Sequence, residues 1–158
     1  MSFQNLFNPD FLDFIRALNT TKVEYILVGG YAVNLHGYFR GTGDMDIWVK
    51  PTRTNYARLV NAFNLFGLSL FDMSEANFLD TRVHDVFTFG RPPVSIDIMT
   101  KVRGLDFEHA LSGSVEFEVG NNIRVRTIGL ADLIKAKQSS GRHKDLDDIA
   151  HLTDGEGF

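Results

Sequence analysis

The stretch "VGGYAVNLHGYFRGTGDMDIWVK", residues 28–50, decides the fold because it joins two strand patterns through a pair of glycines. The apolar run at residues 23–28 predicts a strand that is buried on both faces. Gly29 and Gly30 end this strand, and "YAVNLHG" predicts a short helix closed by its glycine. "MDIWV" then predicts a second strand, which carries Asp46 in its interior.

Three aspartates fall within strand patterns, Asp44 and Asp46 in "GDMDIWV" and Asp97 in "VSIDIMT". Because strand side chains alternate between faces, Asp44 and Asp46 share one face, with Cα atoms roughly 7 Å apart. Aspartate is depleted in strands, so Asp97 needs a reason. If its strand pairs beside "MDIWV", three carboxylates converge on one face. The alternative of three unrelated surface acids does not account for their joint spacing.

Carboxylates this close repel one another, and one pKa rises unless a cation lies between them. Mg²⁺ prefers oxygen ligands and is typically held by one or two carboxylates plus substrate phosphates. Three carboxylates can hold two ions about 4 Å apart, an arrangement that stabilises the attacking and leaving oxygens of phosphoryl transfer. Asp97 is then also a candidate general base. Gly29 and Gly30 would let phosphate approach backbone N–H groups, although any tight strand-to-helix turn also uses glycine.

The remaining patterns predict a mixed α/β (α+β) domain with a partly antiparallel central sheet flanked by helices. Asn8 and Pro9 suit the start of a helix in "NPDFLDFIRALN", and "TNYARLVNAFNLFG" predicts an amphipathic helix. "VFTF" and "VSIDIMT" are joined by a turn at "GRPP", and "VEFEV" and "IRVRTI" predict a hairpin. Strand and helix do not alternate throughout, which excludes a doubly wound fold or a barrel. We expect a single domain over residues 1–158, with a helical pair at 129–152 packed on it.

The bulk composition excludes some chemistries. The 158 residues include no cysteine, so disulfides and thiolate catalysis are excluded. The N-terminus lacks a signal-peptide pattern and no apolar run is long enough for a bilayer, so we expect a cytoplasmic protein without membrane contact. The net charge is −4, yet residues 121–144 hold six basic residues and one acid, which gives +5. A solvated helix face is the simplest interpretation of that segment.

The spacing of Gly29, Gly30, Asp44, Asp46 and Asp97 resembles the nucleotidyltransferase superfamily, the DNA polymerase β-like fold. That family has a Gly-Gly or Gly-Ser turn, then D-x-D on a strand, then a third acid on a later strand. The C-terminal "LIKAKQSSGRHKDLDDIAHL" is similar to the tail of small bacterial members of the abortive-infection (AbiEii-type) toxin group. The matching positions there are Lys137, Gly141, Arg142, Lys144, Asp145 and Asp148.

The resemblance implies an enzyme that moves a nucleoside monophosphate from an NTP to an acceptor hydroxyl, with two Mg²⁺ ions, or Mn²⁺ instead. Asp44, Asp46 and Asp97 would hold the metal and act in catalysis. Gly29, Gly30, Arg40, Thr42 and Lys137 would contact the nucleotide. The same resemblance favours a toxin-like enzyme that acts on RNA or protein, paired with an antitoxin. From the residues alone, the two acids near the start of the last helix are also interpretable as structural, with Lys144 placed to pair with Asp148.

Other functions remain open at this stage. One is an antibiotic-modifying nucleotidyltransferase of the aminoglycoside or lincosamide type, with a small-molecule acceptor. Another is a non-catalytic module that binds a nucleotide or a partner, which would have no need for three mutually repelling carboxylates. A metal-dependent phosphohydrolase or nuclease uses similar acids and usually adds histidine ligands, but the five histidines here do not form a ligand-spaced set.

Overall fold

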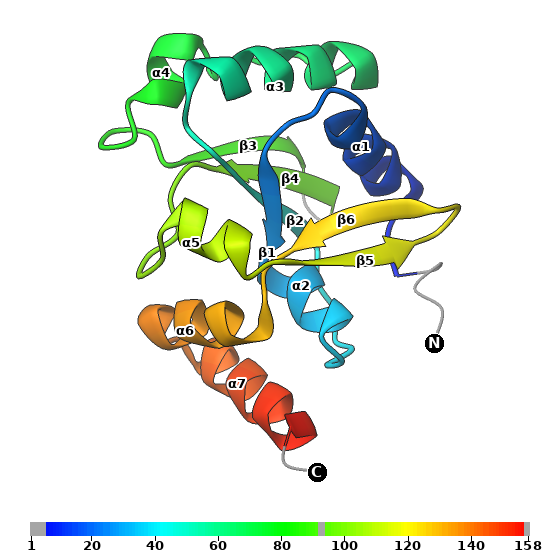
Figure 1. The fold of residues 1–158 in the computed structure, drawn as a ribbon, viewed down its shortest axis with the longest axis vertical. Helices are drawn as coiled ribbons and strands as arrows, with labels where there is room; N and C mark the ends of the chain where they lie inside the picture. The colour runs from blue at the N-terminus through cyan, green and yellow to red at the C-terminus, as the bar shows by residue number, and fades with distance from the viewer. Residues whose placement is uncertain (1–5, 92–93, 157–158) are drawn as a thin grey trace.

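A six-stranded mixed sheet forms the centre of the computed structural model, which describes residues 6–91 and 94–156. The spatial order is β3-β4-β2-β1-β6-β5 (Figure 1). The six strands are β1 (Tyr25–Val28), β2 (Asp44–Val49), β3 (Val86–Arg91), β4 (Val94–Met99), β5 (Val115–Val119) and β6 (Ile123–Thr127). The prolines of the turn expected between β3 and β4 lie outside the described residues.

The strand pairing combines three antiparallel ladders with two parallel ones. β1 with β2, β3 with β4, and β5 with β6 are antiparallel. β2 with β4 and β1 with β6 are parallel. The mixed, partly antiparallel sheet expected from the sequence is therefore confirmed. The two buried central strands, β1 and β2, bring the start of β2 beside the end of β1.

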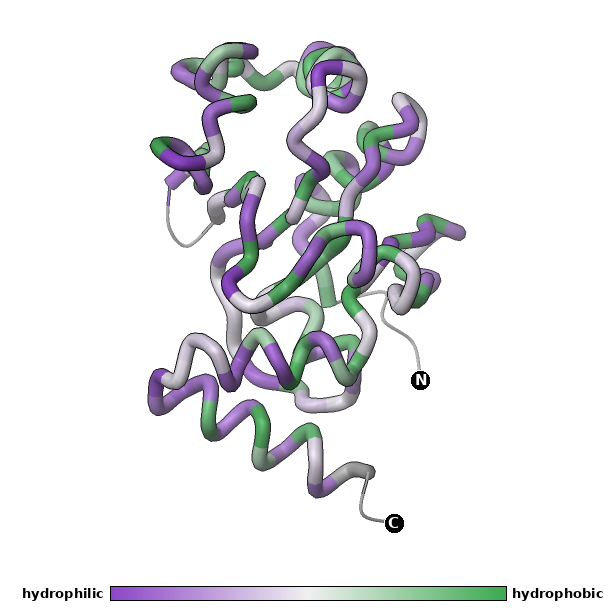
Figure 2. The backbone as a smooth tube through the Cα atoms, turned by 60° about the vertical axis from the view of Figure 1, so that its left-hand side comes forward, coloured by the Kyte–Doolittle hydropathy of each residue, from purple (hydrophilic) through white to green (hydrophobic). Residues whose placement is uncertain are grey.

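Each face of the sheet has its own core. Apolar side chains of α1 (Pro9–Thr20) and α3 (Arg53–Phe66) pack in one core, and those of α5 (Phe107–Ser112) and α6 (Leu130–Ser140) pack in the other. The short helix α2 (Gly29–Leu35) contributes apolar side chains to both cores. Figure 2 shows apolar and polar residues alternating along the helix at the C-terminal end, α7 (His143–Glu156), as expected for an amphipathic helix. The short helix α4 (Glu75–Leu79) follows α3 along the chain and lies beside it at the top of Figure 1.

The helix ends follow local sequence chemistry. Asn8 caps α1 by accepting a 2.8 Å hydrogen bond from the backbone N–H of Asp10, as expected. Gly67 ends α3 and Gly141 ends α6, both in the left-handed region, at φ 88° and 64°. Within the described residues, no helix is long and apolar enough to cross a membrane.

Candidate active site

The carboxylates of Asp46 and Asp97 meet at the centre of the sheet. β2 and β4 are parallel neighbours, and their register places Asp46 opposite Asp97 and Asp44 opposite Ser95. Opposed residues in adjacent strands project to the same face. The structure thus brings the three predicted acids to one face. Trp48, on that same face, is buried and packs edge-to-face on Phe107 of α5.

Asp46 is the most perturbed acid in this group. Burial raises the pKa of Asp46 to about 7, and repulsion by Asp97 and Asp44 adds to the effect, whereas Lys137 opposes it. After burial, the neighbouring Asp97 carboxyl group is the main cause of this rise in the pKa of Asp46. Two carboxylates this close repel each other, which favours the protonated form of Asp46 near neutral pH. A cation that displaced this proton would relieve the repulsion.

Two hydroxyl groups hold the other acids in place. Thr88 Oγ1 on β3 donates a 2.8 Å hydrogen bond to Asp97 Oδ1, and Ser95 Oγ donates to Asp44 Oδ1. Neither hydroxyl was predicted as part of the site. The period-2 pattern of "VSIDIMT" already places Ser95 on the face of Asp97. Thr88 could be found only from the register of the β3–β4 ladder.

The carboxylate oxygens at this site are the type of ligand that binds a hard divalent cation. Asp46 and Asp97 supply closely spaced, mutually repelling carboxyl oxygens, and magnesium is commonly held by one or two carboxylates. Asp44 is turned toward Ser95. Accordingly, the described residues contain no group of three or more metal-ligating side chains already gathered for one ion. The acids therefore form a close pair with a third carboxylate beside it.

Close packing around the site explains both glycines of the Gly-Gly turn. A Cβ on Gly29, whose φ is +72°, would lie 2.2 Å from Asp46 Oδ2. A Cβ on Gly30 would lie 2.3 Å from Thr42 Oγ1. The glycines lie in the first turn of α2 and not before it, and α2 has only seven residues. The absence of a side chain at Gly29 leaves room for Asp46, and its absence at Gly30 leaves room for Thr42.

Arg40 is committed to a partner far along the chain. Its Nε and Nη2 donate hydrogen bonds of 2.6 and 2.8 Å to the two carboxyl oxygens of Asp148 on α7. Its backbone N–H donates to Oδ1 of the buried Asn34 at 3.0 Å. The loop before β2 is thus fixed to both α2 and α7.

Lys137 lies in a buried network of ion pairs. Its Nζ lies 3.2 Å from Asp145 and 3.1 Å from Asp148, both of which are fully buried. Arg142 Nε lies 2.8 Å from Asp145. Burial pushes the pKa of both acids upward, but hydrogen bonds from the cations outweigh it and leave each pKa below its usual value.

This network has a net positive charge. Three cations, Arg40, Lys137 and Arg142, share two carboxylates, which leaves +1 beside Asp46. The expected pairing of Lys144 with Asp148 is wrong, because Asp148 is buried and is bound by Arg40 and Lys137. Isolated buried carboxylates are very costly, so these two acids need their cations.

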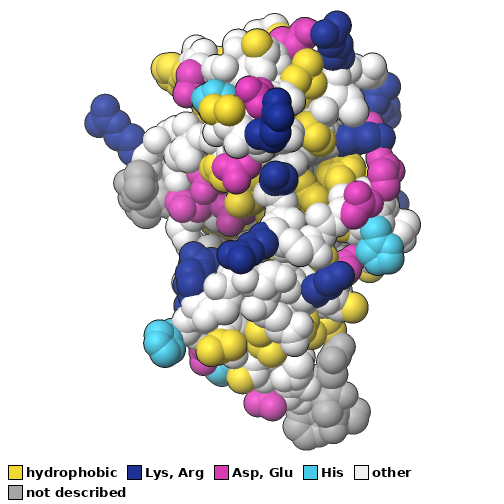
Figure 3. Space-filling view, turned by 90° about the vertical axis from the view of Figure 1, so that its left-hand side faces the viewer, with side chains coloured by type: hydrophobic (Ala, Val, Ile, Leu, Met, Phe, Trp, Pro, Cys, Tyr) yellow, Lys and Arg dark blue, Asp and Glu magenta, His cyan; other side chains and the backbone are white. Residues whose placement is uncertain are grey.

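A cavity of about 250 Å³ opens between Asp46 and this network. Asp46, Gly29, Lys137 and Arg142 line it together with an apolar wall from Val28, Met99, Val102, Ile128, Leu133 and Ala136. Lys101 and Arg103, which the sequence analysis did not single out, also line it. The sequence feature that could have pointed to them is their position just after the strand that carries Asp97. In Figure 3, acidic side chains gather at mid-height, with Lys and Arg side chains directly below them.

The fold is that of nucleotidyltransferases. The lincosamide antibiotic adenylyltransferase LnuA, in a lincomycin-bound crystal structure, matches with a TM-score of 0.54 and 16% identity over 93% of this chain and 96% of that one. An antigenic nucleotidyltransferase-like protein from Paracoccidioides brasiliensis matches with a TM-score of 0.57 and 14% identity over 90% and 74%. No family model and no curated protein matches. The resemblance to the abortive-infection toxin group stays a prediction.

Proposed function

We propose that this protein is a metal-dependent nucleotidyltransferase that moves a nucleoside monophosphate from an NTP to an acceptor hydroxyl. The observation that carries the proposal is the half-buried Asp46–Asp97 pair, whose Asp46 lines a cavity together with Lys137 and Arg142. Carboxylates would hold the metal on one side, and cations would hold the phosphates on the other. The nucleotidyltransferase fold agrees with this assignment.

The three acids divide the work at the reacting centre. Asp46 and Asp97 would hold Mg²⁺, or Mn²⁺ in its place, and Asp44 would complete the ligand set by leaving Ser95; the chemistry suits two ions. Bound metal supplies positive charge to the phosphate oxygens. The acceptor oxygen forms a bond to the α-phosphorus while the bond to the bridging oxygen breaks, and pyrophosphate leaves. Asp97 accepts the acceptor proton.

The cations around the cavity would bind the triphosphate. Lys101, Arg103 and Arg142 would contact the phosphates directly. The charge of Lys137 is already shared with Asp145 and Asp148, so we assign it a supporting contact that adds to the +1 potential. Arg40 is held by Asp148, so its role is to fix the loop of Thr42 over Gly30. Backbone N–H groups at the two glycines would complete the phosphate contacts.

The acceptor is assigned on weaker grounds. Resemblance alone favours RNA or protein as acceptor, a toxin-like role and regulation by an antitoxin in the cytoplasm. The neighbour LnuA was solved with lincomycin, but a likeness in fold does not transfer its acceptor. A small-molecule acceptor and a non-catalytic nucleotide-binding role are the alternatives.

Thermal-shift measurements test the nucleotide site. Each of ATP, GTP, CTP and UTP is added with and without Mg²⁺ to the wild type, to Asp97→Asn and to the exposed control Asp72→Asn. A ligand at about 100 times its Kd adds about 2.7 kcal/mol of stability. We expect one NTP to stabilise the wild type and the control only with metal, and Asp97→Asn to lose that shift. Label transfer from that α-labelled NTP to an extract then identifies the acceptor class. Equal shifts in all three proteins would contradict the proposal, and a metal-dependent shift without transfer would favour the binding module.

A further inference from the structure

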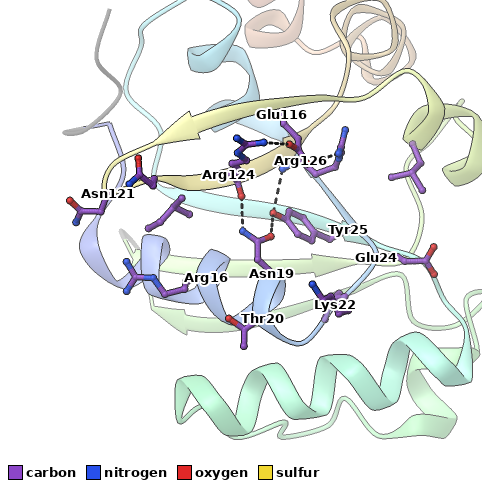
Figure 4. Close-up of a pocket in the computed structure, with 14 residues that line it drawn as sticks. Arg16, Asn19, Thr20, Lys22, Glu24, Tyr25, Glu116, Asn121, Arg124 and Arg126 are labelled. Carbon is purple, nitrogen blue, oxygen red and sulfur yellow. Dashed lines mark hydrogen bonds and ion pairs between the residues drawn. The ribbon is translucent and has the colours of Figure 1, made fainter.

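A second, larger groove lies at the opposite end of β1 from the acid pair. β1 begins at Tyr25, which lines this groove, and ends at Val28, which is opposite Asp46. The groove encloses about 660 Å³ between the end of α1, the start of β1 and the β5–β6 hairpin (Figure 4). We call it the hairpin groove. Its lining is Arg16, Asn19, Thr20, Lys22, Val23, Glu24, Tyr25, Leu111, Glu116, Asn121, Asn122, Ile123, Arg124 and Arg126.

The charge of the hairpin groove is opposite to that of the whole chain. Its lining has four basic and two acidic residues, a net charge of +2, whereas the chain has −4. One of the acids, Glu116, is already bound by Arg126 at 2.6 Å and by Arg124 at 3.6 Å. The pair of Arg16 with Asp13 is exposed on both sides and so is easily exchanged for another anion.

The floor of the groove is fixed by hydrogen bonds. Tyr25 donates its hydroxyl to Asn19 Oδ1 at 2.8 Å, and Asn19 Nδ2 donates to the carbonyl of Arg124 at 2.6 Å. The backbone N–H of Arg126 donates to the Tyr25 hydroxyl at 3.3 Å. Figure 4 shows this network joining α1 to β6, with the cationic side chains around it. The backbone segments that carry the cationic side chains are therefore held together before any ligand binds.

Lys22 occupies a backbone position that favours glycine. It follows the end of α1 with φ +64°, and the N–H groups of Lys22 and Val23 bond back to the carbonyls of Asn19 and Leu18. This is the Schellman arrangement, in which glycine is the usual residue. Among the described residues, the Lys22 ammonium has no ion-pair partner. A strained position that nevertheless carries an unpaired cation is a reason to look for a ligand.

We propose that the hairpin groove binds the phosphodiester backbone of a single-stranded polynucleotide. Its cations come from α1, from the loop after it and from β6, so they are spread along an open groove and suit a chain of phosphates better than one anion. Tyr25, the one aromatic residue of the lining, is only 4% exposed and offers no stacking surface for bases. Recognition would therefore rest on phosphate contacts and be independent of base sequence. The site is separate from the acid pair and does not depend on nucleotidyl transfer.

The test measures binding of a labelled oligouridylate and an oligothymidylate by fluorescence anisotropy without NTP. The groove variant Lys22→Glu/Arg124→Glu is compared with the control Arg53→Glu/Arg82→Glu, which changes the net charge equally at exposed positions away from the groove. About three phosphate contacts give a slope of log K against log salt of about −2, and losing two of them removes about 1.4 from it. We expect the groove variant to bind at least about tenfold more weakly and the control to bind like the wild type.

Four outcomes would overturn the proposal. The groove variant and the control variant could be weakened equally, or polyglutamate could compete as well as an unlabelled oligonucleotide. ATP with Mg²⁺ could displace the oligonucleotide, or the wild type could fail to bind it at about 50 mM salt. The melting temperatures of both variants are measured first. If the charge reversal unfolds the protein, Lys22→Gln/Arg124→Gln replaces it, with a smaller weakening expected. A preference between RNA and DNA identifies the source of the phosphodiester.

Discussion

Asp46→Asn is expected to remove a specific pH dependence from the stability of the folded protein. Burial, with repulsion by Asp97, raises the pKa of Asp46 from 3.8 to about 7 in the folded state. The native protein therefore binds more protons than the unfolded chain between these values. The stability that this group contributes is fully present below about pH 4 and is lost as the pH rises through about 7.

The magnitude follows from the two protonation curves. Between about pH 6 and about pH 8, native Asp46 goes from about nine-tenths to about one-tenth protonated, while the unfolded carboxyl group holds almost no proton. Integration over this interval gives a loss of about 1.4 kcal/mol. For a domain of this size the melting temperature should fall by about 4 °C. Because the Asp97 carboxylate contributes to the raised pKa of Asp46, the size of this fall depends on both groups.

The assay compares melting temperatures of the wild type, Asp46→Asn and Asp72→Asn at the two pH values. Asp72 is exposed, so its substitution matches the chemistry without the burial. The rest of the sequence is identical in the three proteins, so the comparison isolates the contribution of the substituted group. We expect Asp72→Asn to follow the wild type and Asp46→Asn to lack the additional fall. A fall of equal size in the wild type and Asp46→Asn would refute the reasoning.

Three further changes test the surroundings of the acid pair. Gly29→Ala combines a positive φ with a Cβ 2.2 Å from Asp46, so urea unfolding should show a free energy of unfolding lower by about 1–3 kcal/mol. The control Gly41→Ala has open space around its Cβ and should lose less than about 1 kcal/mol. Asp148→Ala leaves Arg40 and Lys137 without a shared partner and should cost about 3–5 kcal/mol, against less than about 1 for the more exposed Asp147→Ala. Lys101→Ala should weaken NTP binding in thermal-shift titrations by about tenfold and change the free energy of unfolding by less than about 0.5 kcal/mol; unchanged NTP affinity would remove Lys101 from the phosphate site.

Local sequence rules predicted the elements and the acid faces well, because both depend on short-range physics. The caps at Asn8 and Gly67 satisfy backbone groups within their own turns. Strand alternation alone placed Asp44 with Asp46, and a single assumption about pairing added Asp97. That assumption was needed because periodicity identifies the face of a residue but not the neighbouring strand. Only the register of β2 and β4 supplies the opposition of Asp46 and Asp97.

The buried ion pairs could not be predicted in the same way. Asp145 and Asp148 lie near the start of a helix, where acids are ordinary, and the local pattern gives no reason to bury them. The partner of Asp148, Arg40, is 108 residues away in the sequence. The interpretation of Lys137 as a nucleotide contact did not include these ion pairs. Its ammonium group is shared by two buried carboxylates.

The two charged clusters together favour an active site over a structural one. The network around Lys137 is nearly balanced, with each carboxylate bound by at least two cations. Among the described residues, no cation forms an ion pair with Asp46 or Asp97, although the charge of Lys137 acts on Asp46. Replacing either by asparagine would relieve the repulsion and stabilise the fold at neutral pH. A module that only needed the fold would gain from that change. The pair of repelling carboxylates therefore supports the proposal that a cation binds here, and the metal-dependent thermal shift of the wild type and Asp97→Asn tests that proposal directly.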